Sequence, residues 1–289
     1  MKRRTALWVT LFVAANVAIG TGMSAYMAGT KLLSAAPARI PDSALAVPHE
    51  SVTFQSNSGS LIHGWFVAGT PGRGVVVLLH GIKGNRLDMV RRAEFLNRAG
   101  YSVLLFDFQA HGESPGRQVT LGHLESRDAA AAVAFAQGRR PAEPVSIIGV
   151  SLGGAAALIG PEPLPLRALV LEAVYPRIQE AVTNRIRVRV GPLADVIAPL
   201  MFVQFKPRAG IPIADLAPLH RLKAVTTPVF VITGAEDRHT TLADSEAMFA
   251  AAAGPKEMWV IPGAVHQDFS AYAPAEYQAR VLAFLGKYR

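Results

Sequence analysis

A serine between glycines is the strongest chemical signal in the sequence. Ser151 stands in the segment GVSLGG at residues 149–154, after an apolar run and before an alanine-rich one. A Gly-x-Ser-x-Gly pattern between a strand and a helix is typical of a turn so tight that side chains flanking the serine would collide. Such a turn strains the serine backbone and lifts its hydroxyl above the sheet, at a helix N-terminus that favours a developing oxyanion. We therefore predict that Ser151 is a nucleophile.

A serine nucleophile needs a base, and the base needs a carboxylate that fixes its tautomer. His266 follows the last apolar run of the chain, and Asp237 follows the run before it. The carboxyl ends of parallel strands meet at one edge of a sheet, so we expect both side chains to meet Ser151 there. His266 would take and return the proton, and Asp237 would orient the imidazole. Glu236 and Glu172 remain open as alternative acids.

A second glycine-containing loop is the candidate oxyanion hole. The segment HGIKGN at residues 80–85 follows another apolar run, and its two glycines allow backbone amides to turn inward. We expect the N–H groups of Ile82 and Leu152 to hold the oxyanion. His80 is expected to order the loop rather than act as the base. The segment DFQAHGES at 107–114 is expected to shape the site without reacting.

The elements that must position these residues alternate along the chain. Unbroken apolar runs, typical of strands covered on both faces, occur at 75–79, 102–106, 145–149, 168–171, 229–232 and 258–261. Helical patterns lie between them, at 87–98, 121–137, 152–159, 242–252 and 275–285. This alternation predicts an α/β fold with a mostly parallel, doubly wound sheet, which residues 51–68 would open as an antiparallel hairpin. Residues 172–222, rich in proline and arginine, are expected to form a small helical insert over the site.

Two features of that insert have more than one interpretation. Arg185, Arg187 and Arg189 alternate with apolar residues, which fits an exposed strand, a basic edge near anionic lipid headgroups, or more simply a solvated face. Residues 200–203 and Phe205 are apolar or aromatic. They would either line an acyl pocket or pack in the core.

Together these motifs resemble the α/β-hydrolase superfamily over residues 50–289. They are most similar to single-domain serine hydrolases with a His-Gly-x-x-Gly-Asn oxyanion loop, a group that includes membrane-anchored α/β-hydrolase-domain proteins and relatives of the prolyl-oligopeptidase catalytic domain. The resemblance implies an α/β-hydrolase fold and cleavage of a small-molecule acyl ester through an acyl-enzyme, without metal or organic cofactor. Thioester or amide cleavage is the alternative. One departure is that Arg-His-Thr-Thr follows Asp237, where many relatives carry a proline.

The first 33 residues are interpreted as a membrane segment. Three basic residues precede an uncharged stretch at 5–29, which as a helix of about 37 Å would cross the hydrocarbon core of a bilayer. The segment is a signal anchor in one interpretation, a signal peptide cleaved near residues 34–36 in the second, and a buried helix in the third. Either membrane interpretation exports the body of the chain, as a membrane-anchored or a secreted protein. Residues 34–49, with three prolines, are expected to be a linker, and 50–289 the catalytic domain.

The composition excludes several classes of protein. A chain of 289 residues with 51% hydrophobic and 17% charged residues is not disordered. The lack of cysteine excludes a disulfide framework, a thiolate metal site and a cysteine nucleophile. The net charge of +8 is concentrated in residues 1–40, which hold five basic residues and no acidic one. Because the body is nearly balanced, no nucleic-acid partner is expected. The sequence carries no signal for an oligomeric state.

Overall fold

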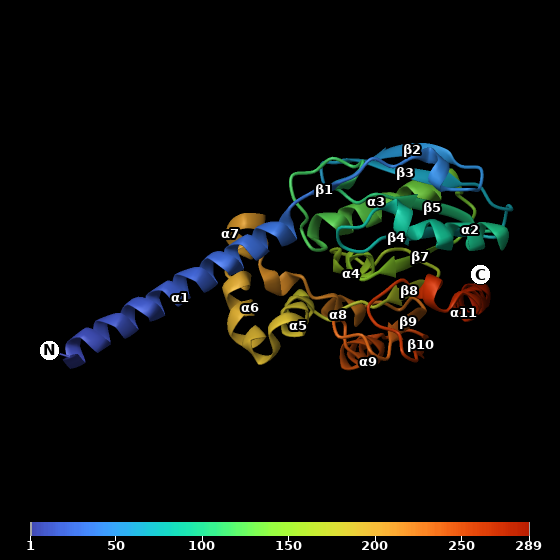
Figure 1. The fold of residues 1–289 in the computed structure, drawn as a ribbon. Helices are drawn as coiled ribbons and strands as arrows, with labels where there is room; N and C mark the ends of the chain where they lie inside the picture. The colour runs from blue at the N-terminus through green and yellow to red at the C-terminus, as the bar shows by residue number, and fades with distance from the viewer. Residues whose placement is uncertain (1, 289) are drawn as a thin grey trace.

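An eight-stranded, mostly parallel sheet forms the centre of the protein (Figure 1). The computed structural model describes residues 2–288. The strand order is β10-β9-β8-β7-β4-β5-β3-β2, in which β3 runs antiparallel to both of its neighbours, β2 and β5, and the other pairs are parallel. Every strand expected from the apolar runs is present, and the hairpin opens the sheet as predicted. Their bounds are β2 Glu50–Gln55, β3 Leu61–Val67, β4 Val75–Leu79, β5 Ser102–Phe106, β7 Val145–Val150, β8 Leu169–Glu172, β9 Val229–Gly234 and β10 Lys256–Ile261.

The register of the parallel strands brings their carboxyl ends to one edge. Leu79 at the end of β4 lies opposite Gly149 of β7. Gly234 at the end of β9 lies opposite Ile261, the last residue of β10. The loops that follow these strands contain all the residues for which we predict chemistry. Parallel pairing therefore brings together segments that are far apart in the sequence.

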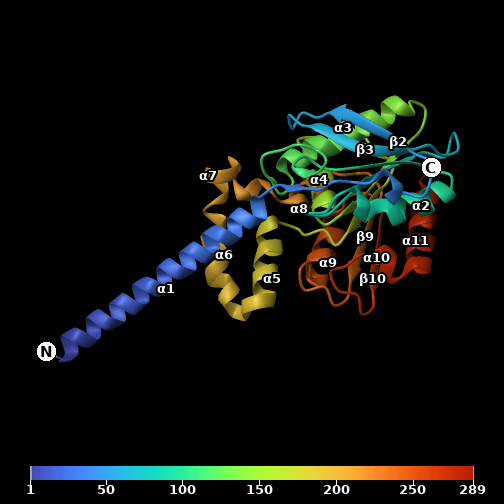
Figure 2. The same ribbon diagram turned by 45° about the horizontal axis from the view of Figure 1, so that its top comes forward.

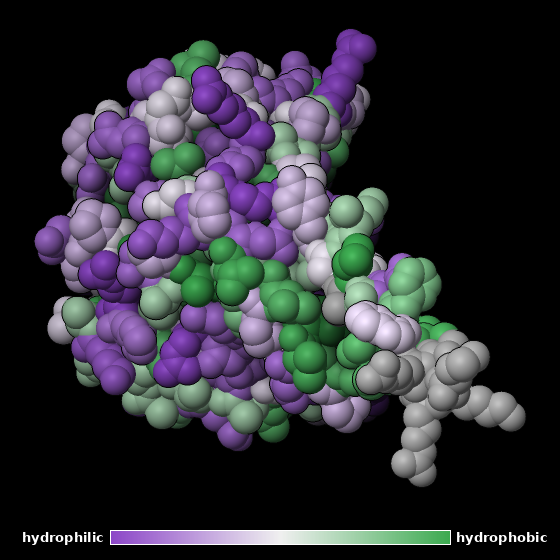
Figure 3. Space-filling view, turned by 90° about the vertical axis from the view of Figure 1, so that its left-hand side faces the viewer, coloured by the Kyte–Doolittle hydropathy of each residue, from purple (hydrophilic) through white to green (hydrophobic). Residues whose placement is uncertain are grey.

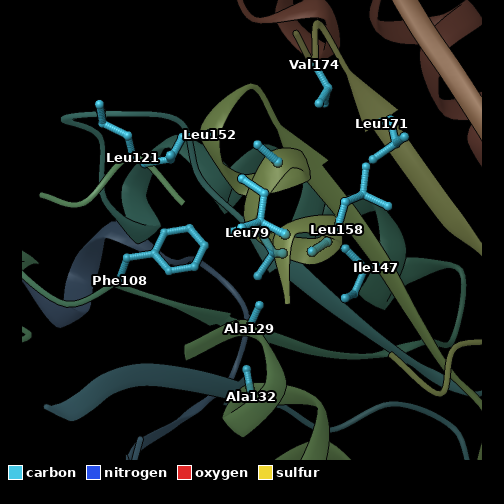
Figure 4. Packing of buried hydrophobic residues seen from close by; sticks show 14 of the residues in the cluster. Leu79, Phe108, Leu121, Ala129, Ala132, Ile147, Leu152, Leu158, Leu171 and Val174 are labelled. Carbon is cyan, nitrogen blue, oxygen red and sulfur yellow. The ribbon is translucent and has the colours of Figure 1, made fainter. Parts of the chain in front are cut away.

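Helices cover both faces of the sheet because alternate residues of each buried strand point to opposite sides. Val77 and Leu79 of β4 belong to the core under α3 (His123–Arg139), α4 (Leu152–Ile159) and α9 (Leu242–Ala251). Leu78 of the same strand belongs to the core under α2 (Val90–Arg98) and α11 (Pro274–Lys287). Figure 4 shows Leu79 in the first core together with Ile147, Leu158 and Leu171.

The insert after β8 forms a small helical cap, as predicted. It consists of α5 (Ile178–Val190), α6 (Ala194–Phe202), α7 (Phe205–Ala209) and α8 (Pro218–Leu222), with 3-10 turns at 191–193 and 213–215. The interpretation of the arginine stripe as an exposed strand is wrong, because Arg185, Arg187 and Arg189 lie on α5. Residues two apart on a helix point in different directions, so the three cannot form one stripe. Arg187 and Arg189 are exposed, whereas Arg185 is half-buried.

The long helix α1 (Lys2–Leu33) projects from the body, and its last turns lie against the cap (Figures 1 and 2). Arg208 of α7 donates to the hydroxyl of Thr30 at 2.6 Å, and its guanidinium lies 4.7 Å from the centre of the Tyr26 ring. Ala25 and Leu33 are buried. The preceding apolar residues of α1 are mostly exposed. The helix therefore has an exposed amino-terminal part and a carboxyl-terminal part that belongs to the domain.

Residues 34–49 do not form a free linker, contrary to expectation. Within them β1 (Ala36–Pro37) pairs in parallel with β6 (His111–Gly112), and Ile40 and Leu45 are buried. The prolines alone suggested a tether, but the segment also contains apolar side chains that pack on the sheet and backbone groups that pair with a neighbouring loop. A 3-10 turn at Asp42–Ala44 completes the segment.

Candidate active site

Ser151 stands in a strained turn between β7 and α4. Its backbone angles are φ 49° and ψ −110°, a conformation that L-residues rarely adopt. A Cβ atom added at Gly149 would lie 2.6 Å from the Cα of Gly154, and one added at Gly153 would lie 2.3 Å from the carbonyl oxygen of Leu79. Only glycine fits at these two positions, which is the turn that the sequence pattern predicts.

Asp237 and His266 form a direct hydrogen-bonded pair. Nδ1 of His266 lies 2.7 Å from Oδ2 of Asp237, so the carboxylate accepts the Nδ1 proton. The other carboxylate oxygen accepts from the backbone N–H groups of His239 at 2.8 Å and Thr240 at 3.0 Å. These bonds hold the acid in place and fix the imidazole tautomer. Nε2 of His266 is left with its lone pair, as a general base requires.

A narrow cavity of about 30 Å³ lies at Ser151. Ile82 and Leu152, the two expected oxyanion donors, line it together with the serine, and so does His239. The ring of His239 lies 5.2 Å from that of His266, so the acid–base pair borders the same region. Among residues 2–288 no hydrogen bond joins the Ser151 hydroxyl to His266. Catalytic hydrogen bonds often tighten only when substrate binds.

His80 holds the loop at residues 80–85 in place. Its Nδ1 lies 2.7 Å from the carbonyl oxygen of Gly81, and its Nε2 accepts from the N–H of Phe108 at 3.1 Å. Burial, with a smaller contribution from the charge of His111, lowers the pKa of His80 to about 3. The imidazole is therefore neutral and fully hydrogen-bonded. It orders the loop, as predicted, and is not available as a base.

Asp107 connects two of the loops around the site. Its carboxylate accepts from the backbone of Arg86 at 2.7 Å and pairs with the Arg86 guanidinium at 2.5 Å. It also accepts from the N–H of Glu113 at 3.0 Å. Burial raises the pKa of Asp107, while the charge of Arg86 opposes that effect. The aspartate thus shapes the site, in the role that the sequence analysis gave to residues 107–114.

The alternative acids are not in a position to serve His266. Glu172 is buried and bound by the Arg92 guanidinium at 2.6 Å and by the hydroxyl of Tyr277 at 2.6 Å. The side chain of Glu236 is exposed. Among the acids of residues 2–288, it is Asp237 that is hydrogen-bonded to the His266 imidazole.

Three side chains of the site have donor atoms close enough together to hold a metal ion. One donor atom each from Asp237, His239 and His266 lies within 4.8 Å of the others. However, the facing atoms of Asp237 and His266 already share a hydrogen bond of 2.7 Å. An ion bound between them would have to displace that bond, so the arrangement suits an acid–base pair better than a metal site.

Several cavity residues were not assigned to the site from the sequence. Leu32 at the end of α1, Tyr175 after β8, Arg185 of α5 and His239 all line the cavity beside Ser151. Their positions depend on how the cap and α1 pack on the sheet, which no local pattern encodes. The expected acyl-lining residues 200–203 and Phe205 are not among the lining residues. Phe205 is buried in the core, which was the alternative interpretation.

Known proteins share both the sequence and the fold. Residues 70–215 match the family model described as serine aminopeptidase, S33. An uncharacterized protein of Mycobacterium tuberculosis is 31% identical over 276 residues, which cover 93% of this chain and 90% of that protein. An α/β-hydrolase domain-containing protein of Arabidopsis thaliana is 26% identical over 260 residues, covering 83% of this chain and 79% of that protein.

Solved structures with this fold include esterases. An esterase from Pyrococcus furiosus superposes with a TM-score of 0.73 at 22% identity, covering 89% of this chain and 98% of the esterase. An esterase from Exiguobacterium antarcticum gives a TM-score of 0.60 at 16% identity, covering 82% of this chain and all of the esterase. The fold is consistent with the family model that matches the sequence, and the similarity to the mycobacterial protein extends over most of both chains. The chain therefore belongs to the serine aminopeptidase S33 family and is a hydrolase of the α/β-hydrolase superfamily.

Proposed function

We propose that the protein is a serine hydrolase that cleaves carboxylic esters through an acyl-enzyme. The proposal rests above all on the Asp237–His266 pair, whose hydrogen bond of 2.7 Å leaves Nε2 of the imidazole as a base next to His239, a residue that lines the cavity at Ser151. The esterases among the structural neighbours are compatible with this chemistry, although their low sequence identity speaks for the fold alone.

In the proposed mechanism Ser151 is the nucleophile. Its oxygen attacks the acyl carbon while Nε2 of His266 takes the hydroxyl proton. Asp237 holds the imidazole in its Nδ1–H tautomer and stabilises the imidazolium that forms. The N–H groups of Ile82 and Leu152 stabilise the oxyanion of the tetrahedral intermediate. His266 then protonates the leaving alcohol, and water hydrolyses the acyl-enzyme by the same steps in reverse.

The test is labelling of the full chain with a fluorophosphonate, together with turnover of a short nitrophenyl ester. The wild type should be labelled and active, and Ser151→Ala should lose both properties while keeping the unfolding transition. Ser146→Ala is the matched control, at a buried serine of β7, the strand that precedes Ser151, and should behave as the wild type. Undiminished labelling of Ser151→Ala would remove that residue from the role of nucleophile.

A peptidase or amidase is the second candidate, because the matching family model is described as a serine aminopeptidase. Amide cleavage uses the same groups but depends more on protonation of the leaving amine by His266. Thioester cleavage would need no such assistance. Turnover of an aminoacyl anilide, an alkyl ester and an acyl thioester by the same preparation distinguishes the three activities.

Membrane anchoring through α1 is part of the proposal. Residues Ala6–Leu33 are long and apolar enough to cross a bilayer, and their large side chains are mostly exposed. Hydrophobic surface is also gathered on the side of the molecule from which α1 projects (Figure 3). The cap next to α1 also exposes apolar side chains, namely Val188, Val190, Leu193, Val196, Leu200 and Val203. Such a surface is expected next to lipid rather than water, and export of the catalytic body would follow from the basic N-terminus.

A further inference from the structure

One wall of the Ser151 cavity is a cation that has no partner among residues 2–288. Arg185 lines the cavity from α5. In the part of the chain that the structure describes, its guanidinium makes no hydrogen bond and no ion pair. Its neighbours on the same helix behave differently, since Arg187 pairs with Asp195 at 2.6 Å and Arg189 is exposed to solvent. Half-buried arginines in a folded core are normally paired, so an unpaired one facing a cavity needs an explanation.

A second donor beside Arg185 is also unused. The hydroxyl of Tyr175 is buried and has no hydrogen-bond partner among the residues described, although the side chain is only 3% exposed. Tyr175 lines the same cavity. Burial raises the pKa of this hydroxyl, so the group stays protonated and is able to donate. A buried hydroxyl with no partner is costly unless a ligand or water satisfies it.

The carboxylates near these donors are already committed. Asp237, which interacts with the Arg185 charge, accepts the Nδ1 proton of His266 and two backbone N–H groups. Glu125, whose charge acts on the Tyr175 hydroxyl, accepts hydrogen bonds from Thr120, Gln109 and the N–H of Gly122. Among the described residues, neither acid forms an ion pair with Arg185 or a hydrogen bond with the Tyr175 hydroxyl.

We infer that Arg185 and Tyr175 form an anion subsite beside Ser151, and that the substrate is an acyl ester carrying a carboxylate or phosphate close to the bond that is cleaved. This inference rests on the proposed function, because it names the substrate of that site. A guanidinium and a phenolic hydroxyl are suitable partners for either anion. The apolar residues of the cavity, among them Leu32 and Ile178, would contact the rest of the acyl group.

The test compares neutral and anionic esters of equal length on the full chain in detergent. On the acyl side, nitrophenyl pentanoate is paired with the mono-nitrophenyl ester of glutaric acid. On the leaving-group side, monobutyryl glycerol is paired with monobutyryl glycerol phosphate. In the wild type, at least one anionic ester should exceed its neutral partner about tenfold in kcat/KM. The pair that shows the preference identifies the side and the anion.

Variants assign that preference to the subsite. Arg185→Gln should reduce the ratio to about one, mainly by raising KM for the anionic ester, and Tyr175→Phe should reduce it about threefold. Arg185→Lys should keep part of the preference, since the charge remains and the planar fork is lost. Arg189→Gln, one turn further along the same helix, should leave the ratio unchanged. A wild type that prefers both neutral esters, or a ratio that survives Arg185→Gln, overturns the inference.

A binding measurement separates this inference from the proposed function. Glutarate and inorganic phosphate are added to the wild type and to Arg185→Gln, and the melting temperatures are compared. A ligand that binds only the folded state raises Tm, so one anion should stabilise the wild type and have little effect on the variant. This result supports the subsite even where no ester is hydrolysed, in which case only the proposed function fails. No stabilisation by either anion, or equal stabilisation of both chains, overturns the subsite.

Discussion

The carboxylate of Asp237 makes three hydrogen bonds, and each contributes to a single imidazole orientation. Two come from backbone N–H groups of its own loop and one from His266. Asp237→Asn preserves the shape but would favour the wrong tautomer of His266. We expect kcat for a short ester to fall about 10³–10⁴-fold. Steady-state kinetics checks this, with the exposed neighbour Glu236→Gln as control. A loss of less than tenfold would indicate that another acid serves the histidine.

Another single-residue prediction concerns His80. Its pKa is about 3 in the folded protein, against an ordinary value of 6.5, so between these values the unfolded chain binds the extra proton. The contribution of neutral, buried His80 to the free energy of unfolding is therefore fully present above pH 6.5. It is lost as the pH falls from 6.5 towards 3, by at most about 1.4 kcal/mol per pH unit.

Urea unfolding at pH 7.5 and pH 5 measures this effect. The free energy of unfolding should fall between the two values by about 2 kcal/mol more in the wild type than in His80→Asn, whose side chain does not titrate. The comparison uses the change with pH, so any constant loss of stability in the variant cancels. Equal pH dependence in both proteins would mean that His80 titrates normally in the folded state.

Among the secondary-structure elements, a buried ion pair ties β8 to two helices on one face of the sheet. Glu172 at the end of β8 binds Arg92 of α2 and Tyr277 of α11. Glu172→Ala would leave the Arg92 charge buried, with the half-exposed Asp268 as its remaining ion-pair partner among the described residues. We expect this substitution to lower the free energy of unfolding by about 3–5 kcal/mol.

The surface pair of Lys287 and Glu257 provides the comparison, since its side chains are 59% and 41% exposed. Glu257→Ala should cost no more than about 1 kcal/mol. Denaturant unfolding of both variants measures the difference. Folded Glu172→Ala should still react with a fluorophosphonate. If a fully folded Glu172→Ala variant were not labelled, Glu172 would again be a candidate for the acid that orients His266.

Elements of this protein differ in how far the sequence predicts them. The buried strands are local apolar runs and were predicted within a few residues, as was the glycine turn at Ser151, because each depends on residues that are adjacent in the chain. The register of parallel strands then brings Asp237 and His266 to the edge where Ser151 lies. The cavity was not predicted, because Leu32, Tyr175 and Arg185 come from three segments whose contacts are made only on folding.

At the scale of the whole molecule, α1 is both a membrane-helix candidate and part of the catalytic domain. Leu33 accepts a hydrogen bond from Val119 at 2.9 Å through its carbonyl group, and Leu32 forms a wall of the Ser151 cavity. A chain that begins at Ser34 should therefore lose about 3 kcal/mol of stability, from the burial of Leu33 and Ala25. A chain that begins at Gly20 keeps these contacts and should unfold like the full protein.

Urea unfolding of the two shortened chains, beside the full protein in detergent, measures the contribution of the last turns of α1. Nitrophenyl ester turnover should fall only in the chain that begins at Ser34, because that chain lacks the Leu32 wall. Equal stability and activity of both shortened chains would favour the cleaved signal peptide.

The contact between the loop at residues 80–85 and the end of α1 has a consequence for where the enzyme works. Lys83 donates to the carbonyl oxygen and the hydroxyl of Ser34, the residue that follows α1. With α1 in a bilayer, this contact would prevent the catalytic body from moving away from the membrane on a flexible tether. Ser151 would stay at a fixed distance from the lipid headgroups, where it could reach esters at the membrane surface rather than esters dissolved in the bulk solution.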